Sequence, residues 1–269
     1  SNVAFGINST LMEENFPEYN VVNFGSHGKL GLTLHLNDIK PYLKPNDVVI
    51  IIPTHQMFFS NISGFVETKP KYGSKNLLSV YLDVYPEGVK NFNLPQLICL
   101  PEIIQQRFPF KTSQIIQIIR SKVTGKKYLC IEEKTYTRSG FDSNGDYIAH
   151  LHEVDNNNNT IGNYLQGNLD NSTFDEINRF YEECSKKGIQ VYFSCPPVAE
   201  DKYIFEIDTF DKLQNRMRDN LKVQTLGDIP DFVYPRSYFY EPPHHLNAIG
   251  REIRTDLIIK KMQDNKNGD

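Results

Sequence analysis

The sequence lacks tryptophan, has only four cysteines among its 269 residues, and contains no long apolar run. Its longest apolar run, Val48 to Ile52, is far shorter than the roughly 18 uncharged apolar residues that a membrane span requires. None of the cysteines are spaced as CxxC, which argues against a zinc knuckle or a redox dithiol. We therefore expect buried free thiols and no disulfide framework from Cys99, Cys130, Cys184 and Cys195.

An excess of positive charge is also missing. The chain has 29 Lys and Arg against 33 Asp and Glu, for a formal net charge of −4, and we predict no nucleic-acid partner. Its length suits one large α/β domain or two small ones. Seventeen Phe and fifteen Tyr provide aromatic mass for a core or for a sugar- or acyl-binding cleft. The sequence starts at Ser1 without an initiator Met or a signal peptide, so we expect a processed or trimmed chain.

Strand and helix patterns alternate at both ends of the chain. Short apolar runs bounded by turn residues predict strands, and apolar residues at helical spacing predict helices between them. Strands followed by helices at this spacing imply a doubly wound parallel sheet. The predicted strands cover 19–24, 47–53, 189–195 and 223–226, and the predicted helices open at Ser9 or Thr10 and cover 30–43, 172–187 (capped by Ser172 or Thr173), 205–221 and 248–262.

Residues 61–165 differ from the flanking sequence, because Gly, Lys, Asn and Tyr interrupt weaker apolar periods. We predict an insertion or lid at about 61–165 within a single domain of residues 1–269. Inside it we expect two helices within 97–119 split near Pro109, a strand at 128–132, a hairpin at 135–152 and a polar turn at 155–159.

Three blocks carry the chemistry. The first is SNVAFGINS at 1–9, a turn of small residues before a helix; the second is VVNFGSHG at 21–28, a predicted strand ending in a Gly-rich turn. The third is EPPHHLNAIGR at 241–251, near the C-terminus. Because the carboxyl ends of parallel strands meet at one sheet edge, we expect these blocks to converge there.

These blocks resemble the SGNH (GDSL-like) hydrolase and acyltransferase superfamily. The first block resembles the motif Gly-Ser-Ser-Asn-x-x-x-Gly-Ile-Asp-Ser of a bacterial branch, the third resembles its acid–His block, and SCPPV at 194–198 resembles its fourth-strand ending. The acid–His block is the most specific of them, and the resemblance says little about 61–165. It implies a flavodoxin-like three-layer α/β/α sandwich with a parallel doubly wound sheet.

The resemblance also implies a catalytic triad. Ser1 would be the nucleophile, His245 its general base, and Glu241 the acid that orients the imidazole. A serine hydroxyl is a poor nucleophile until a base takes its proton, and an acid must fix the tautomer of that base. Glu241 departs from the family, which usually has Asp at this position.

The implied oxyanion hole combines backbone N–H groups of Ser1 and Gly28 with a side chain after the strand at 47–53. The family has Asn there, whereas this chain reads Pro-Thr-His-Gln, so His55 or Gln56 would replace it. A neutral histidine donates one hydrogen bond and can serve in this way.

Three further residues are candidates for substrate binding: His27, His244 and Asn247. His27 is equally well explained as an exposed turn residue. Two other serines compete with Ser1 as nucleophile, but we expect Ser9 to cap a helix and Ser26 to serve as a turn residue.

Metal binding has two weaker signals. His150 and His152 could form a metal pair, but no third ligand is evident, and an exposed strand accounts for them. Residues 142, 144, 146 and 153 match positions of a calcium loop, yet Tyr147 stands where that loop needs Gly. A hairpin with an Asn144-Gly145 turn explains the same residues, so we predict no metal and no cofactor.

We therefore predict a serine-dependent acyl-ester hydrolase that acts through an acyl-enzyme, of esterase or lipase type, with carbohydrate O-deacetylation as one form of the reaction. The alternatives are a polysaccharide O-acyltransferase and a non-catalytic carbohydrate-binding protein on the same fold. The expected partner is a small-molecule or carbohydrate acyl ester. The resemblance suggests a bacterial protein of the cytoplasm or the cell envelope, an inference from analogy alone.

Overall fold

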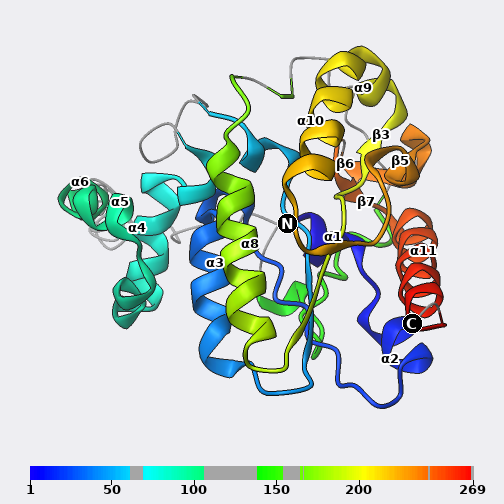
Figure 1. Ribbon diagram of the computed structural model, residues 1–269, viewed down its shortest axis with the longest axis horizontal. Helices are drawn as coiled ribbons and strands as arrows, with labels where there is room; N and C mark the ends of the chain where they lie inside the picture. The colour runs from blue at the N-terminus through cyan, green and yellow to red at the C-terminus, as the bar shows by residue number, and fades with distance from the viewer. Residues whose placement is uncertain (61–68, 106–137, 154–163, 166, 242, 268–269) are drawn as a thin grey trace, which may run out of the picture.

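The computed structural model describes residues 1–60, 69–105, 138–153, 164–165, 167–241 and 243–267. These residues form a mixed α/β structure built largely of helices (Figure 1). The helices are α1 (Asn2–Gly6), α2 (Ser9–Asn15), α3 (Leu32–Ile39), α4 (Lys75–Val84), α5 (Leu94–Ile98), α6 (Leu100–Gln105), α8 (Asn171–Ser185), α9 (Glu200–Phe205), α10 (Ile207–Asn220) and α11 (Ala248–Asn267).

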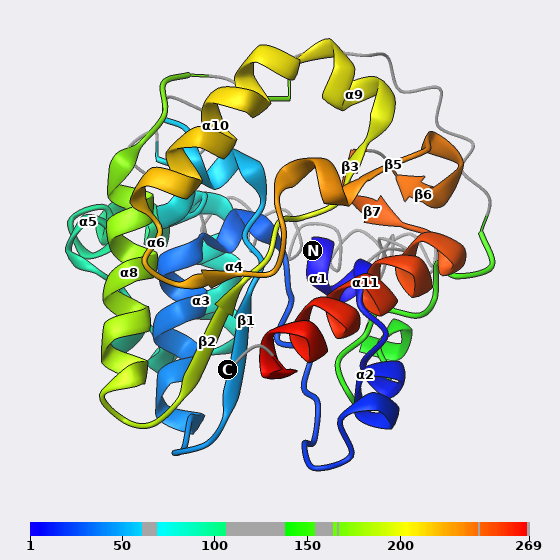
Figure 2. The same cartoon turned by 45° about the vertical axis from the view of Figure 1, so that its right-hand side comes forward.

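The main sheet is parallel, as the strand–helix alternation predicts. It has the order β1 (Val48–Ile51), β2 (Gln190–Phe193) and β4 (Gln224–Thr225), with Val49 opposite Val191. Helices α3 and α8 lie on one side of this sheet and α11 lies on the other (Figure 2). Two smaller strand pairs are also present among the described residues: β3 (Val198–Ala199) with β5 (Val233–Tyr234), and β6 (Phe239–Glu241) with β7 (His245–Leu246).

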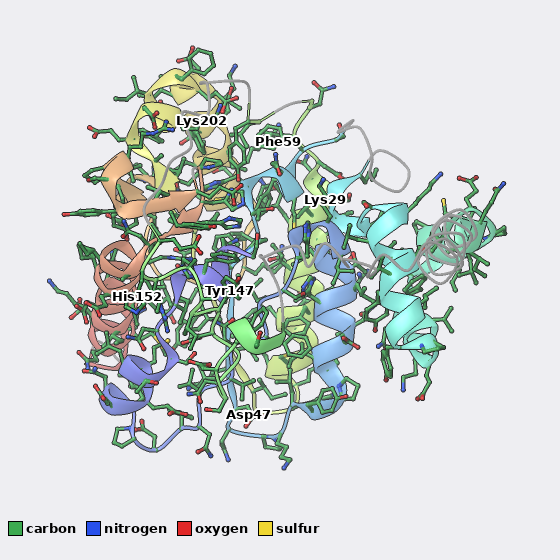
Figure 3. All side chains as sticks on the ribbon, turned by 180° about the vertical axis from the view of Figure 1, so that it is seen from behind. Lys29, Asp47, Phe59, Tyr147, His152 and Lys202 are labelled. Carbon is green, nitrogen blue, oxygen red and sulfur yellow. The ribbon has the colours of Figure 1, made fainter. Side chains whose placement is uncertain are left out.

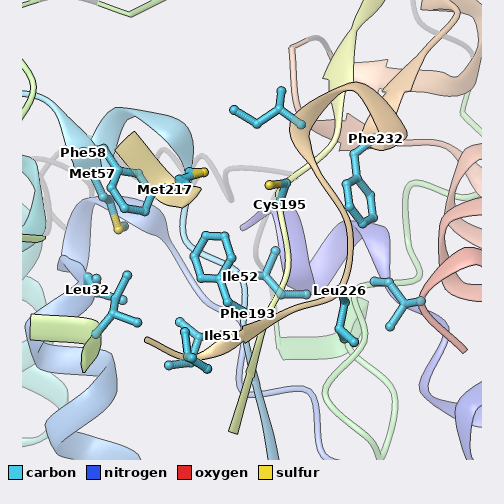
Figure 4. Packing of buried hydrophobic residues seen from close by; sticks show 14 of the residues in the cluster. Leu32, Ile51, Ile52, Met57, Phe58, Phe193, Cys195, Met217, Leu226 and Phe232 are labelled. Carbon is cyan, nitrogen blue, oxygen red and sulfur yellow. The ribbon is translucent and has the colours of Figure 1, made fainter. Parts of the chain in front are cut away.

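The core lies between the sheet and these helices. Phe58, Phe193 and Phe232 are completely buried, and Figure 4 shows their rings packed among aliphatic side chains and sulfur atoms. Cys99, Cys184 and Cys195 are buried free thiols, as expected, while Cys130 lies outside the described residues. Among the described residues, no helix combines the length and apolar character needed to cross a membrane.

The strand predicted at 19–24 is wrong, because this segment has no β-ladder. Tertiary hydrogen bonds take the place of a ladder: the Val21 N–H donates to Glu13 Oε1 at 2.8 Å, and the Asn23 N–H donates to the Asn144 carbonyl at 2.7 Å. The side chains of Val22 and Phe24 are exposed, so the apolar run is not a buried strand sequence. Nothing within the run itself specifies a partner strand.

Two helix caps differ from prediction by one to three residues. Asn8 caps α2, since its side chain accepts from the Leu11 N–H. Asp170 caps α8, since its side chain accepts from the Ser172 N–H. A carboxylate or carboxamide slightly upstream is as good a cap as a hydroxyl, so the sequence alone does not select among them.

The predicted insertion is described in part. Helices α4, α5 and α6 lie together at one side of the molecule (Figure 1). The break between α5 and α6 falls at Cys99, whereas Pro109, the strand at 128–132 and the turn at 155–159 lie outside the described residues.

The turn predicted around residues 142–146 is present. Phe141 and Tyr147 form an isolated antiparallel bridge, and Asp142 Oδ1 accepts from the N–H of Asp146 at 2.9 Å. Gly145 has a φ of +90°, and a Cβ there would lie 2.4 Å from the Asn23 carbonyl oxygen. Glycine is therefore required both for its backbone angle and for the close approach of the 19–24 segment.

Candidate functional site

The β6–β7 pair brings two members of the predicted triad together. Glu241 and His245 lie opposite each other across the two antiparallel strands. The His245 ring donates from Nδ1 to Glu241 Oε2 at 2.9 Å, because a carboxylate can only accept. This bond fixes the tautomer that leaves Nε2 as a proton acceptor, which is the nitrogen that a general base must present.

An aromatic ring from α1 supports the imidazole. Phe5 stacks on His245 with ring centroids 4.3 Å apart and planes 14° from parallel. Burial, and next the positive charge of the nearby Ser1 amino group, lower the pKa of His245 to about 3. The imidazole is consequently neutral at physiological pH and able to accept a proton.

Ser1 stands directly before α1, which packs against β7 and α11. Its hydroxyl does not cap the helix, and its nitrogen donates a hydrogen bond to the Ser26 carbonyl. His245 Nε2 is buried with no hydrogen-bond partner among the described residues, so the predicted Ser1–His245 hydrogen bond is not formed here. The structure thus pairs the predicted acid Glu241 with the predicted base His245, and His245 makes no hydrogen bond to the predicted nucleophile Ser1.

The Gly-rich turn lies close to this site. Gly28 begins a short 3-10 helix (Gly28–Leu30), and a Cβ on it would lie 3.7 Å from a Thr54 methyl group. His27 is half-buried, and its Nδ1 accepts from the Lys29 N–H at 3.1 Å. Burial lowers the pKa of His27 to about 4, with the Ser1 ammonium as the next contribution. His27 therefore lies near Ser1 and is not an exposed turn residue.

His55 is completely buried, yet both of its ring nitrogens lack a hydrogen-bond partner among the described residues. Its ring meets Phe210 edge to face at a centroid distance of 5.1 Å. Burial lowers the pKa of His55 to about 3, and His244 contributes next. Gln56 instead donates one of its two amide N–H groups to the Tyr164 carbonyl at 3.2 Å, whereas neither ring nitrogen of His55 is used among the described residues.

His244 and Asn247, the other two predicted substrate-binding residues, differ in their contacts. The His244 ring lies 4.6 Å from that of His245, and burial lowers its pKa well below the usual value. Asn247 instead has a structural role, because its Oδ1 accepts from the Gly250 N–H at 3.1 Å and its Nδ2 donates to the Ser237 carbonyl at 2.8 Å. It therefore caps α11 and ties it to the preceding loop.

A buried carboxylate connects the three blocks of the sequence. Asp146 is completely buried and accepts from Ser9 N and Oγ at 2.8 and 2.7 Å, from Asn23 Nδ2 at 2.7 Å and from an Arg251 guanidinium nitrogen at 2.6 Å. Ser9 is therefore neither a helix cap nor a free nucleophile. The sequence reveals no link between 142–146 and the other blocks, so this pairing was not predicted.

The metal signals do not lead to a site among the described residues. Asp146 is engaged by Arg251, and no group of three or more His, Cys, Asp or Glu side chains there could hold an ion. The expectation of an exposed strand around His150 and His152 is wrong. His150 is buried and donates to the Leu246 carbonyl at 2.9 Å, beside Tyr147, while His152 lies in a turn at the surface (Figure 3).

One pairing has no signal in the sequence. Ser26 Oγ and His35 Nε2 are 2.7 Å apart, and His35 Nδ1 donates to the Gly31 carbonyl at 2.8 Å. Nε2 must therefore accept the Ser26 proton, which is the geometry of an activated serine. Ser26 comes from the Gly-rich turn and His35 from α3, and only the fold brings them together.

Comparison of the chain with protein-family models, with curated proteins and with solved structures gives no match. A functional proposal therefore rests on the geometry of this site and on the sequence blocks that form it.

Proposed function

We propose that the protein is a serine-dependent acyl-ester hydrolase of SGNH type, with Ser1 as nucleophile, His245 as general base and Glu241 as the orienting acid. The observation that supports it most is the 2.9 Å hydrogen bond between Glu241 and His245, which leaves Nε2 as acceptor beside α1. We further propose that the parallel sheet and its flanking helices belong to a three-layer α/β/α sandwich in which residues 61–165 form a lid.

The reaction proceeds in two steps. His245 Nε2 takes the Ser1 hydroxyl proton as Oγ attacks the ester carbonyl, and the same imidazolium then protonates the departing alcohol. A water molecule next gives a proton to His245 as it attacks the acyl-enzyme carbonyl, and the imidazolium then returns a proton to Ser1 Oγ as the acid leaves. Glu241 stabilises the imidazolium in both steps. Catalytic hydrogen bonds are often formed only with substrate bound, and the missing Ser1–His245 bond is compatible with this sequence of events.

The oxyanion of each tetrahedral intermediate needs donors close to Ser1. We assign this role to the N–H of Gly28 and to His55, whose ring nitrogens have no other partner among the described residues. His27 and His244 lie near the Ser1 ammonium, which influences the pKa of both, and we assign them to substrate contact. An acylated carbohydrate suits this polar, aromatic surrounding. Transfer to a sugar hydroxyl in place of water would make the same machinery an O-acyltransferase.

The test is labelling with a fluorophosphonate probe followed by intact-mass analysis. We expect one adduct on the natural chain and none on Ser1→Ala. A Ser26→Ala variant serves as the matched control and should label as the natural chain does. Peptide mapping of the adduct then identifies the labelled serine directly.

The Ser26–His35 hydrogen bond favours a second candidate nucleophile. An adduct that survives Ser1→Ala and disappears in Ser26→Ala would transfer the nucleophile role to Ser26 with His35 as its base. If no folded variant gives an adduct, the result would favour a carbohydrate-binding protein without catalysis. The buried His245 Nε2, which has no hydrogen-bond partner among the described residues, is compatible with that function as well.

A further inference from the structure

The largest fully buried side chain among the described residues is that of Arg254, on helix α11. This helix packs against α1, and Figure 2 shows the two side by side. Arginine is almost never fully buried without a charged partner, because removing a guanidinium from water is costly. The surroundings of Arg254 therefore have to account for a charge in the protein interior.

The guanidinium of Arg254 donates its hydrogen bonds to backbone carbonyls. Nη1 donates to the carbonyls of Asn2 at 3.0 Å and Gly6 at 3.4 Å, which lie at the two ends of α1. Nη2 donates to the carbonyl of Cys195 at 3.4 Å, two residues after the end of β2. A Cβ at Gly6 would lie 2.5 Å from Nη1, so the absence of a side chain there makes room for the guanidinium. Arg254 thus joins both ends of α1 to the carboxyl end of β2.

The groups around this guanidinium are uncharged. Its Nε has no hydrogen-bond partner among the described residues, and the three carbonyls carry no net charge. Two titratable groups lie near it, the Cys195 thiol and the Tyr234 hydroxyl. Burial raises the pKa of both, that of Tyr234 to about 12, so both are neutral at pH 7. Burial also lowers the pKa of Arg254 to about 10, which still leaves it charged at pH 7.

Two carboxylates act on the groups beside the guanidinium, but each is paired with a cation of its own. Asp228 is paired with Arg218, and Asp231 is paired with Lys261 at 2.8 Å. No carboxylate of the described residues forms an ion pair with Arg254 itself. Its charge is therefore not neutralised by a neighbouring side chain.

The same helix offers a buried arginine that is neutralised. Arg251 lies one turn before Arg254 and is also buried, but Asp146 accepts from its Nη2 at 2.6 Å. An ion pair of this kind offsets much of the cost of burying a charge, and removing one partner of it is strongly destabilising. Arg254 is held in the interior without such a partner, so its charge acts on whatever lies next to it.

The charge lies beside the start of α1. Asn2, whose carbonyl accepts from Arg254, directly follows Ser1 in the chain. Asn2 Nδ2 also donates to the Ile52 carbonyl at 3.3 Å, so the start of α1 meets the carboxyl end of β1. Ligands of open α/β sheets bind at this edge. The unneutralised charge is thus at the edge of the sheet that holds Ser1.

The field of Arg254 reaches two groups at this edge. Burial lowers the pKa of the Ser1 amino group to about 5, and the charge of Arg254 is the next cause. Burial also lowers the pKa of His55 to about 3, with His244 as the second cause and Arg254 as the third. A positive potential that disfavours protonation at these groups favours negative charge at the same place.

We propose that Arg254 is a positioning residue that holds α1 and places a fixed, unneutralised positive charge beside Ser1, where it stabilises negative charge. Ester hydrolysis at Ser1 forms such a charge on the oxygen of each tetrahedral intermediate, and this link to the reaction rests on the function proposed above. A charge that is already in place needs no rearrangement when the oxyanion forms. The field of Arg254 at residue 1 is a property of the fold and can be measured without the reaction.

A purely structural role for Arg254 leads to different expectations. Tying α1 to the loop after β2 requires hydrogen-bond donors for the carbonyls but no charge. Glutamine supplies two such N–H donors without charge, whereas lysine keeps the charge and lacks the planar fork of donors. Arg254→Gln and Arg254→Lys therefore separate the two roles.

The experiment introduces a thiol at residue 1 of the full chain with Ser1→Cys and measures its pKa. The pH dependence of alkylation by iodoacetamide, followed by peptide mapping, gives this pKa separately from the other thiols. In this background we expect Arg254→Gln to raise the pKa of the thiol by about 1 pH unit or more, and Arg254→Lys to change it by about 0.3 pH unit or less. An equal rise in both variants, or no rise in the folded Arg254→Gln chain, would overturn the proposal.

A further variant and a matched control complete this experiment. Arg254→Met has an apolar side chain of similar length, which suits a buried position, and it should raise the pKa of the thiol as Arg254→Gln does. The control removes the neutralised arginine of the same helix together with its partner, as Arg251→Gln with Asp146→Asn, and should change the pKa by about 0.3 pH unit or less. A rise in the control as large as that in Arg254→Met would show a general disturbance of the fold and would overturn the proposal.

Fluorophosphonate labelling of the chain with Ser1 in place tests the link to the reaction. We expect Arg254→Gln to lower the labelling rate by about tenfold or more, and Arg254→Lys to label within about threefold of the natural rate. Labelling unaffected by Arg254→Gln would overturn the role of Arg254 in the reaction. If the natural chain is not labelled while the pKa of the thiol follows the charge of the side chain at position 254, the proposed hydrolase function fails and the charge placed beside residue 1 is supported.

Discussion

Asp146 accepts hydrogen bonds from three parts of the chain that lie far apart in sequence, and it does so with no exposure to solvent. Its carboxylate is held by Ser9, by Asn23 and by the charged partner Arg251. Each of these comes from one of the three sequence blocks at 1–9, 21–28 and 241–251. Asp146 therefore fixes the relative positions of the three blocks.

We expect Asp146→Ala to lower the free energy of unfolding by about 3–5 kcal/mol, because it leaves the Arg251 charge buried without its partner. Urea unfolding at pH 7 measures this loss. The control is Asp264→Ala, an exposed position of α11, which should change the free energy of unfolding by about 0.5 kcal/mol or less. An equal effect of both substitutions would show that the network contributes little.

For Glu241→Gln we expect the rate of fluorophosphonate labelling to fall by about a hundredfold or more, with little change in melting temperature. The amide retains the shape but not the charge that stabilises the imidazolium. Time-resolved intact mass gives the rate, and Glu252→Gln at an exposed position is the control. A labelling rate unaffected by Glu241→Gln would remove Glu241 from the proposed triad.

At the scale of secondary-structure elements, Asn247 lies directly before α11, and this position determines what its side chain contacts. Both polar groups of its side chain are used, one on the Gly250 N–H and one on the Ser237 carbonyl. The motif at 241–251 is therefore in part a strand–turn–helix junction, which explains why His245 and the helix cap lie only two residues apart.

Asn247→Ala should cost about 1 kcal/mol of stability, whereas Asn247→Ser, which keeps a capping oxygen, should cost about 0.5 kcal/mol or less. Urea midpoints of the two variants measure the difference. If Asn247 bound substrate as well, Asn247→Ser would lose activity while retaining stability, so the activity of this stable variant separates the two roles.

On the scale of the whole molecule, the described residues bury several histidines in neutral form. Burial lowers the pKa of His55 and His245 to about 3 and that of His27 and His150 to about 4. In the unfolded chain each of these histidines has a pKa of about 6.5. Between these values the unfolded state binds more protons, so this contribution to stability is complete above about pH 6.5 and is lost as the pH falls.

We expect the free energy of unfolding to decline steadily below about pH 6.5. His55→Phe should reduce this slope by about 1.4 kcal/mol per pH unit between about pH 6 and 4, because one buried histidine no longer resists protonation. Urea unfolding at half-unit pH intervals measures the slope. His152→Gln is the exposed control and should leave the slope unchanged; an unchanged slope in His55→Phe would contradict the assignment.

Several features could be predicted from the sequence by itself. The apolar runs around β1 and β2 predict parallel strands because only such strands bury both faces, and the helical spacing of 248–262 predicts α11. The resemblance of the block at 241–251 implies the pairing of Glu241 with His245, and the two side chains are joined by a 2.9 Å hydrogen bond. All of these signals are local, because periodicity and spacing report only on residues that are close together in the chain.

Only the tertiary structure decided the rest, because the remaining contacts join segments that are distant in the chain. The Ser26–His35 pair, the buried Asp146 and the burial of His150 have no counterpart in any local pattern. The edge of β1 that has no strand partner among the described residues is of the same kind. The apolar sequence of a strand indicates that both of its faces are buried. Only the assembled sheet shows which edge of that strand has no partner among the described residues.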